Sequence, residues 1–216
     1  MLGSTNGAQR ASSRSHVRPI VGLLLGMSLL GSLAAAPSVG ATTGSTVRIG
    51  TATTMTSTVV RPWYSVETYY LSLVNCTRTG GWVLRDGTCR GYGSGRYSAY
   101  VRPLRLSDGI SNRVTRPYAR LLATRGVCSH FLDHDPGYRL RRAGFTGWTW
   151  GENIGCRDGY STARAAILWS HLAFQAEKST NGGHWRNIKN PRYTYIGIGI
   201  WRYGSRTRLV TDFYRA

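Results

Sequence analysis

The sequence predicts an α/β sandwich with an antiparallel sheet. Helix-type patterns precede and separate the strand-type patterns, and the end of the chain has the pattern of a β-hairpin. The stretch from residue 61 onward is long enough to bury roughly 68–70% of its unfolded surface. The 7 Trp, 13 Tyr and 4 Phe among 216 residues exclude a wholly disordered chain.

The N-terminal part predicts export from the cell. Three arginines precede an apolar run over residues 20–36, and the small residues Val39-Gly40-Ala41 follow it. This order is typical of a secretory signal peptide, which we place at residues 1–41. The alternative is an uncleaved membrane anchor, but the run is at the short end for a spanning helix. Residues 42–60 are rich in Ser and Thr and predict a flexible tether before a domain at residues 61–216.

Two helices are predicted in the first half of the domain. The first begins at residues 62–65 and runs to about Cys76, after which glycine turns bound a short strand. The second begins with Thr115 as its N-cap and carries Pro117 in its first turn. It ends at Gly126, because glycine suits the left-handed conformation that follows many helices.

The second half of the domain predicts one strand, one long helix and a hairpin. The strand covers residues 149–156. Ser161 or Thr162 caps the helix, which Asn181-Gly182-Gly183 breaks. The hairpin follows over residues 194–214, with a turn at Tyr203-Gly204-Ser205.

Four cysteines suffice for two disulfides, and an exported chain is expected to oxidise them. We pair Cys76 with Cys89, since they bracket one short stretch, and Cys128 with Cys156. Four cysteines allow three pairings, and the sequence leaves the other two open.

The chain is strongly basic. It has 28 Lys and Arg against 9 Asp and Glu, a formal net charge of +19. Without residues 1–41 it keeps 25 basic and 9 acidic residues, and only two of the basic residues are lysines. Because such an arginine bias also reflects genomic composition, we give the net charge little weight as evidence for a binding partner. It still leaves binding to an anionic cell-surface polymer as one hypothesis.

Candidate chemistry lies where rare acids and histidines stand beside glycines and aromatics. Gly151-Glu152-Asn153 follows two tryptophans, and Gly183-His184-Trp185 follows a helix that ends near Glu177. His130 comes two residues after Cys128, so a disulfide would fix its backbone. The sequence contains neither a G-x-S-x-G nor an H-E-x-x-H motif, so a hydrolase hypothesis rests on these residues alone.

Five motifs resemble, in order, those of the CAP superfamily. This superfamily groups cysteine-rich secretory proteins, antigen-five allergens, pathogenesis-related proteins and secreted bacterial proteins with an SCP-like domain. The resemblance covers about residues 62–216, its details resemble bacterial members, and the arginine bias is typical of an actinobacterium. The motifs are Cys128-Ser129-His130, residues 139–145, Gly151-Glu152-Asn153-Ile154, residues 183–188 and residues 193–200.

The resemblance implies a three-layer α-β-α sandwich with a central, mainly antiparallel sheet and an open cleft. It also implies a cleft tetrad of two histidines and two glutamates, and His130, Glu152 and His184 match three of the four. The helix position expected to hold the second glutamate is Leu172 here. We therefore assign Glu177 to the tetrad, with an exposed helix-end residue as the alternative.

Such a tetrad has three possible uses. Neutral imidazoles at His130 and His184 suit zinc or another divalent cation, and each carboxylate can orient one histidine. The same groups suit acid–base chemistry, with Glu152 and His184 as candidate catalytic residues. The third reading is a polar cluster that only ties the sheet to its loops. The sequence leaves enzymatic activity open.

Three functions follow as hypotheses. The first is a secreted CAP-domain protein, extracellular or cell-wall associated, whose cleft binds a divalent metal and a small apolar or lipid ligand. The second is a metal-dependent extracellular hydrolase or peptidase that uses the same tetrad. The third is a polyanion binder on cell-wall polymer or nucleic acid. We expect a monomer with no membrane anchor after cleavage and no specific nucleic-acid partner.

Other polar residues have simpler interpretations. His171 faces inward on its predicted helix and is expected to be a packed core histidine. His134 is expected on a loop surface. Arg139, Arg141 and Arg142 share a short helix, and we expect them to form a solvated face.

Overall fold

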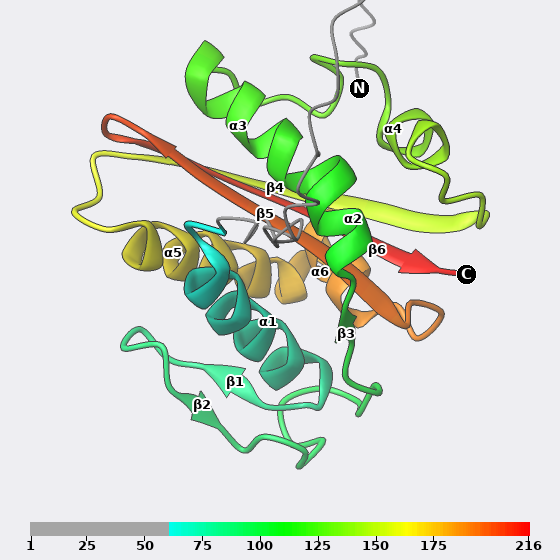
Figure 1. The fold of residues 1–216 in the computed structure, drawn as a ribbon. Helices are drawn as coiled ribbons and strands as arrows, with labels where there is room; N and C mark the ends of the chain where they lie inside the picture. Colours follow the sequence, from blue (N-terminus) through cyan, green and yellow to red (C-terminus); the bar gives the residue numbers. More distant parts are fainter. Residues whose placement is uncertain (1–60) are drawn as a thin grey trace, which may run out of the picture. The chain divides into compact units, whose positions relative to one another are not determined.

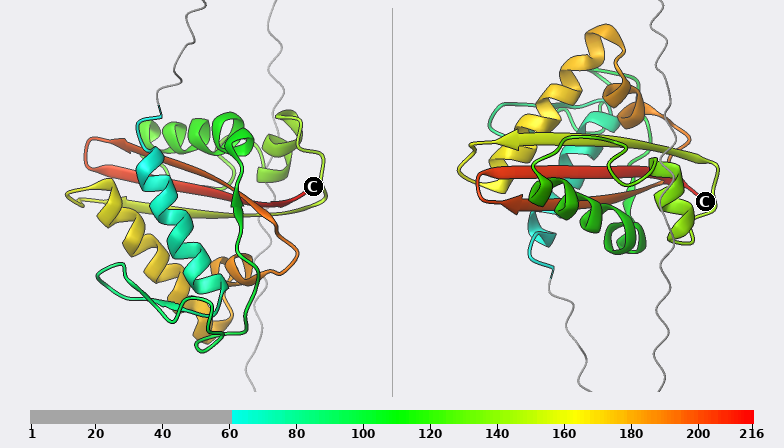
Figure 2. Two further views of the ribbon diagram at one scale, coloured as in Figure 1. Left: turned by 60° about the horizontal axis from the view of Figure 1, so that its bottom comes forward. Right: turned by 90° about the horizontal axis from the view of Figure 1, so that it is seen from above.

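The computed structural model describes residues 61–216 (Figure 1). The expected signal peptide and tether, residues 1–41 and 42–60, lie outside the described residues. Within the described part, no helix is both long enough and apolar enough to cross a bilayer. The expected three-layer sandwich is confirmed: helices cover both faces of a central sheet (Figure 2).

The central sheet has the strand order β3-β5-β6-β4. Strand β6 (Arg206–Arg215) pairs antiparallel with both β5 (Tyr195–Tyr203) and β4 (Thr149–Asp158). The short β3 (Arg105–Leu106) pairs parallel with β5. The sheet is therefore mainly antiparallel, as expected, and the long strand β4 forms one of its edges.

One face of the sheet is covered by α1 (Tyr64–Arg78), α5 (Ala163–Ala176) and α6 (Gly183–Lys189). The side chain of Thr162 caps α5 by accepting a hydrogen bond from the backbone N–H of Ala165, as expected for a threonine N-cap. The side chains buried between these helices and the sheet form the largest core cluster of the described residues. It includes Leu73, Ile167, Ile188, Ile198 and Phe213.

The opposite face carries a continuous helical segment and one separate helix. Helix α2 (Asp108–Ile110) leads through a π-helical turn (Ser111–Thr115) into α3 (Arg116–Arg125). Helix α4 (Pro136–Arg142) follows after a loop. Helix α3 begins directly after Thr115 and has Pro117 in its first turn, as expected. Thr115 nevertheless caps nothing, because its backbone is already helical and its side chain makes no capping hydrogen bond. Gly126 ends α3 in the left-handed conformation, as expected.

Two glycines of β5 explain how the helical segment approaches the sheet. A Cβ at Gly197 would lie 2.2 Å from Ile110 Cγ2, and one at Gly199 would lie 2.1 Å from the Thr115 backbone. Only glycine leaves room for this contact. The Ser111 hydroxyl accepts a hydrogen bond from the Ile198 N–H between them, at 2.9 Å.

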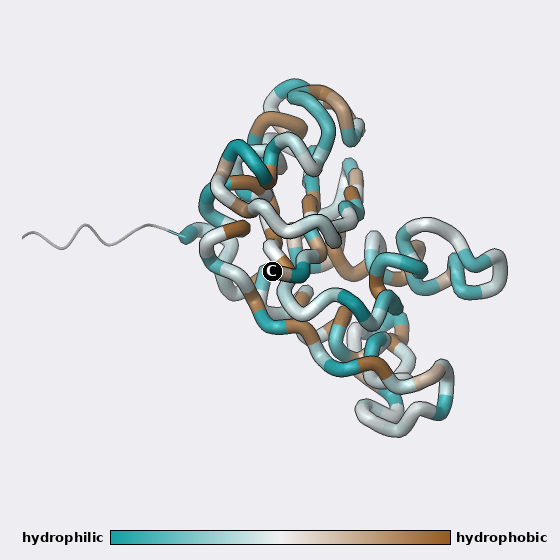
Figure 3. Tube along the Cα trace, turned by 90° about the vertical axis from the view of Figure 1, so that its right-hand side faces the viewer, coloured by the Kyte–Doolittle hydropathy of each residue, from teal (hydrophilic) through white to brown (hydrophobic). Residues whose placement is uncertain are grey.

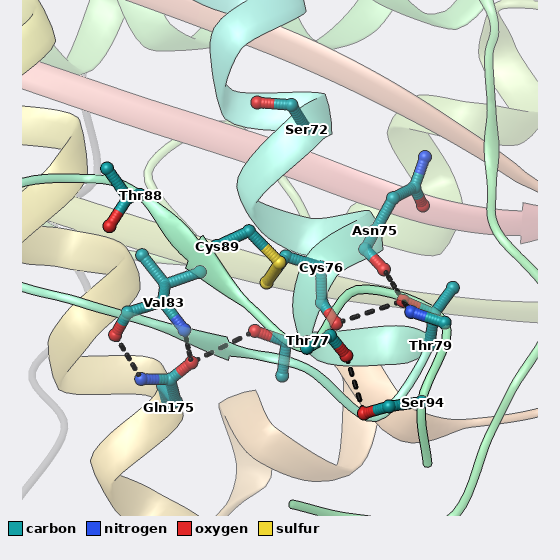
Figure 4. Close-up of a disulfide and its surroundings, with 12 residues drawn as sticks. Ser72, Asn75, Cys76, Thr77, Thr79, Val83, Thr88, Cys89, Ser94 and Gln175 are labelled. Carbon is teal, nitrogen blue, oxygen red and sulfur yellow. Dashed lines mark hydrogen bonds between the residues drawn. A yellow bond between two sulfur atoms is a disulfide. The ribbon is translucent and has the colours of Figure 1, made fainter. Parts of the chain in front are cut away.

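A small two-stranded sheet packs at the end of α1. Strand β1 (Trp82–Val83) pairs antiparallel with β2 (Cys89–Arg90), and the Cys76–Cys89 disulfide joins β2 to α1 (Figure 4). The Gln175 side chain of α5 bonds both the N–H and the C=O of Val83, at 2.9 and 3.0 Å. These links fix the hairpin to two helices.

The second disulfide joins Cys128 to Cys156, so it ties the loop after α3 to strand β4. A loop of this length gives a disulfide roughly 3–4 kcal/mol of stabilisation in the chain-entropy model. Hydrophilic and hydrophobic residues alternate along the traced chain (Figure 3).

Candidate functional site

One hollow beside strand β4 is lined by His130, Glu152, Glu177 and His184. Its volume is about 490 Å³. The four side chains come from separate parts of the chain: the loop after α3, strand β4, the 3-10 turn Glu177–Thr180 and the first turn of α6. The structure thus brings together all four residues of the expected tetrad.

The first half of the site is a pair formed by His130 and Glu152. His130 Nδ1 lies 2.7 Å from Glu152 Oε1. The histidine side chain is 39% exposed, whereas that of the glutamate is 1% exposed. The nearby disulfide fixes the loop that carries His130. The carboxylate therefore orients the ring while the ring faces the hollow.

Arg139 completes this half of the site. Its guanidinium forms a buried ion pair with Glu152 Oε2 and also donates to the carbonyls of His130 and His134, at 2.9 and 2.6 Å. The guanidinium carbon lies 3.6 Å from the centre of the Tyr118 ring. The expectation that Arg139 lies on a solvated face is wrong. Its side chain is only 7% exposed, because it contacts Glu152 and the backbone of the loop that carries His130.

The second half of the site is formed by His184 and Glu177. His184 Nδ1 lies 2.6 Å from Glu177 Oε1, and the backbone N–H of His184 donates to Oε2 at 2.9 Å. The His184 ring stacks on Phe174, with centroids 4.3 Å apart. Partial burial alone would raise the pKa of Glu177, but the hydrogen bond and charge of His184 lower it overall. Glu177 is thus held ionised against the ring.

Two asparagines connect the halves. The Asn187 side chain donates to the Glu152 carbonyl at 3.1 Å and to Asn153 Oδ1 at 2.8 Å. The Asn153 side chain in turn donates to the His184 carbonyl at 3.1 Å. Gly151 makes room for this contact, since a Cβ there would lie 2.7 Å from Asn187 Oδ1. Helix α6 is therefore held at a fixed position against β4.

Comparison with known proteins identifies the fold. No protein-family model matches the chain, and no curated protein matches it by sequence. Among solved structures, an outer surface protein from Borrelia burgdorferi is similar over 70% of this chain and 92% of that chain, with 14% identity and a TM-score of 0.51.

Two further structures are similar at lower scores. An extracellular protein from Bacillus anthracis that contains an SCP domain matches 70% of this chain with 19% identity and a TM-score of 0.48. This chain spans about two fifths of that protein, 41% of its length. NaASP2, solved with Zn²⁺, matches 69% of this chain and 79% of its own, with 14% identity and a TM-score of 0.46.

The chain shares its fold with the Borrelia outer surface protein. The order of its layers and the cleft beside β4 agree with what the five motifs imply, and both disulfides join the expected pairs. At 14% identity the likeness establishes the fold alone.

The donor atoms of this cleft decide whether a divalent cation fits it. Within residues 61–216, no cluster of three or more His, Cys, Asp or Glu side chains is arranged to hold a metal ion. His130 and His184 each use Nδ1 for a carboxylate, and neither Nε2 has a hydrogen-bond partner among the described residues. The two Nε2 atoms therefore remain as the imidazole nitrogens without a protein partner in this hollow.

Asp212 lies on strand β6 beside this site. It stands opposite Glu152 in the β4–β6 register and is fully buried. Neither carboxylate oxygen has a hydrogen-bond partner among the described residues. Burial, and then the charge of Glu152, raise the pKa of Asp212 well above its usual range, while Arg139 opposes this rise. Sequence analysis missed this residue, although an acid inside an apolar strand pattern was a visible signal.

Asp212→Asn is expected to stabilise the protein more at pH 8 than at pH 5. A carboxyl group with a raised pKa in the folded state contributes stability below its unfolded pKa and loses it as pH rises. Asparagine does not titrate, so the variant does not lose this stability as pH rises. For one proton the free energy of unfolding of the unaltered protein falls by up to about 1.4 kcal/mol per pH unit. Urea unfolding at both pH values measures the difference. Asp108→Asn, at an exposed position, is the control, and an equal effect of Asp212→Asn at both pH values contradicts the prediction.

Proposed function

We propose that this protein is a secreted CAP-domain protein whose cleft binds a divalent cation through the Nε2 atoms of His130 and His184. A small ligand with an apolar part would bind beside the cation. The observation that carries the proposal is the matched use of Nδ1, since each histidine gives that nitrogen to its own glutamate.

The chemistry of metal-binding histidines supports this proposal. A histidine that binds a metal through one nitrogen commonly donates the other N–H to a carboxylate, which fixes the ring and its tautomer. Both rings are partly exposed to the same hollow. All four cysteines are in disulfides and supply no thiolate. With two protein ligands, fewer than the three usual in catalytic zinc sites, we expect modest affinity.

Two exposed apolar side chains that follow His130 in sequence support an amphiphilic ligand. Phe131, adjacent to His130, is 71% exposed, and Leu132 beside it is 41% exposed. Exposed apolar side chains next to a polar site favour a ligand with both kinds of surface. A bound cation would supply an electrophilic centre for its polar end.

Binding is favoured over hydrolysis by the state of the two carboxylates. Glu152 accepts from His130 with one oxygen and from Arg139 with the other. Glu177 accepts from the His184 ring with one oxygen and from its backbone N–H with the other. Each carboxylate oxygen already holds a hydrogen-bond partner, so both carboxylates are better suited to orienting the histidines than to abstracting a proton from a substrate.

Zinc titration calorimetry on the purified protein tests the proposal. We expect one site, abolished in His130→Ala/His184→Ala and weakened about 10–100-fold in Glu177→Gln, which disturbs the orientation of one ring. His134→Ala is the matched control, because His134 is an exposed histidine that does not line the hollow. Absence of zinc binding, or equal binding in the double variant, would overturn the proposal.

A further inference from the structure

A second hollow lies on another part of the domain. It is formed by residues 100–105 before and within β3, residues 191–194 before β5, and Arg215 at the end of β6. Its volume is about 760 Å³, and it shares no lining residue with the His/Glu cleft. We call it the arginine groove.

The arginine groove is lined by four exposed arginines and by no acidic residue. None of their guanidinium groups forms an ion pair or a hydrogen bond within residues 61–216. Arg105 lies over the Tyr195 ring, 4.8 Å from its centre. The guanidinium groups are therefore available to an external anion. The four are Arg102, Arg105, Arg192 and Arg215.

A fifth arginine, Arg78, is buried beneath the groove and joins its two walls. Its side chain donates to the carbonyl of Arg102 at 2.9 Å, on one wall. It also donates to Asn190 at 3.0 Å and Tyr193 at 3.2 Å, on the other wall, and to Ile188 at 2.6 Å. All its partners are neutral carbonyls, so its positive charge is not cancelled by a described acid.

The neighbouring Lys189 indicates the electrostatic character of this region. Its ammonium donates to the carbonyls of Arg78 and Ala99, at 2.8 and 2.6 Å. Burial, then repulsion from Arg78 and Lys178, lowers the pKa of Lys189 to about 8. Burial is the main cause of this shift, and the two positive neighbours add to it, so an anion in the groove would meet further positive charge behind its wall.

We propose that the arginine groove binds a phosphodiester chain that carries no bases, such as a polyol phosphate polymer. Guanidinium groups match phosphate oxygens with paired hydrogen bonds. Four of them along one groove suit a chain of repeated phosphates rather than a single ion.

The aromatic side chains of the groove argue against single-stranded nucleic acid. Sites for single strands combine positive charge with several rings on which bases stack. Here only Tyr100 presents an exposed ring, 54% exposed. The Tyr193 ring is buried and stacks on Phe213, 5.6 Å between centroids. The groove therefore offers contacts for the backbone charge and almost none for bases.

The test measures binding of a fluorescently labelled synthetic octamer of glycerol phosphate by anisotropy at several salt concentrations. We expect the logarithm of the binding constant to fall with the logarithm of salt with a slope of about −3, for four phosphate contacts. Arg102→Gln/Arg192→Gln should reduce the slope to about −1.4 and the affinity at least tenfold. Arg85→Gln/Arg125→Gln removes the same charge at exposed positions outside the groove and should change both values little.

Four outcomes would overturn the proposal. They are no binding by the unaltered protein, equal loss in both arginine variants, tighter binding of an oligodeoxythymidylate octamer, and loss of binding in His130→Ala/His184→Ala. The last would place the site in the His/Glu cleft. Thermal unfolding of each variant checks that the substituted proteins remain folded.

Discussion

Arg139→Met is expected to lower the free energy of unfolding by about 3–5 kcal/mol, because removal of one partner leaves a buried charge uncompensated. Glu152 would keep a carboxylate whose side chain is 1% exposed, with His130 as its remaining partner. The backbone carbonyls of His130 and His134 would also lose a donor. Urea unfolding at pH 7 measures the change.

Two variants make the Arg139 experiment specific. Arg141→Met changes an exposed arginine on the same helix and should cost less than about 0.5 kcal/mol. Arg139→Met/Glu152→Gln removes both charges and should recover part of the lost stability. Replacing both members of a buried ion pair costs less free energy than removing one member and leaving the other charge unpaired. Equal effects of Arg139→Met and Arg141→Met would contradict the prediction.

Arg78→Met is expected to destabilise the protein by at least about 3 kcal/mol. The substitution keeps apolar volume but leaves four carbonyls without their donor, and each buried unsatisfied group costs about 1–3 kcal/mol. These carbonyls lie in two segments of the chain, one before β3 and one from the end of α6 to β5. Without the Arg78 side chain these two segments should separate more easily. Hydrogen exchange of residues 100–105 and 188–195 should rise together with the loss of stability.

Arg85→Met is the control for Arg78. Arg85 is exposed, and its replacement should change unfolding by less than about 0.5 kcal/mol. A loss below about 1 kcal/mol in Arg78→Met would mean that water or a neighbouring side chain satisfies the carbonyls.

Much of the fold could be predicted because local signals and packing agree. The first helix was expected to end near Cys76 and ends at Arg78, and the Thr162 cap and the turn at Gly204 are at their expected places. The elements that sequence analysis missed are short. Strand β3 has two residues and owes its existence to its parallel partner β5, so no period marks it in the sequence.

The four tetrad residues could be predicted because they lie in or near sequence motifs. The roles of the residues that hold them in place, Arg139 and Asn187, could not. Arg139 was misread from charge alone, although helical spacing puts it on the same face as the buried Pro136 and Leu140. Asn187 supports the site through a backbone carbonyl 35 residues earlier, and such a contact leaves no local pattern. Long-range polar contacts of this kind depend on the completed fold.

The position of β4 has a consequence for association between copies of the chain. An edge strand of ten residues is a template on which another copy can add a strand, and such pairing leads to aggregation. The Tyr193 hydroxyl bonds the Trp150 carbonyl at 2.9 Å, and Asn187 bonds that of Glu152. Asn187, which lines the cleft, and Tyr193, which lies outside it, thus occupy two backbone acceptors of this strand. Loss of the Asn187 side chain would free one of them, so its replacement is expected to lower solubility as well as binding.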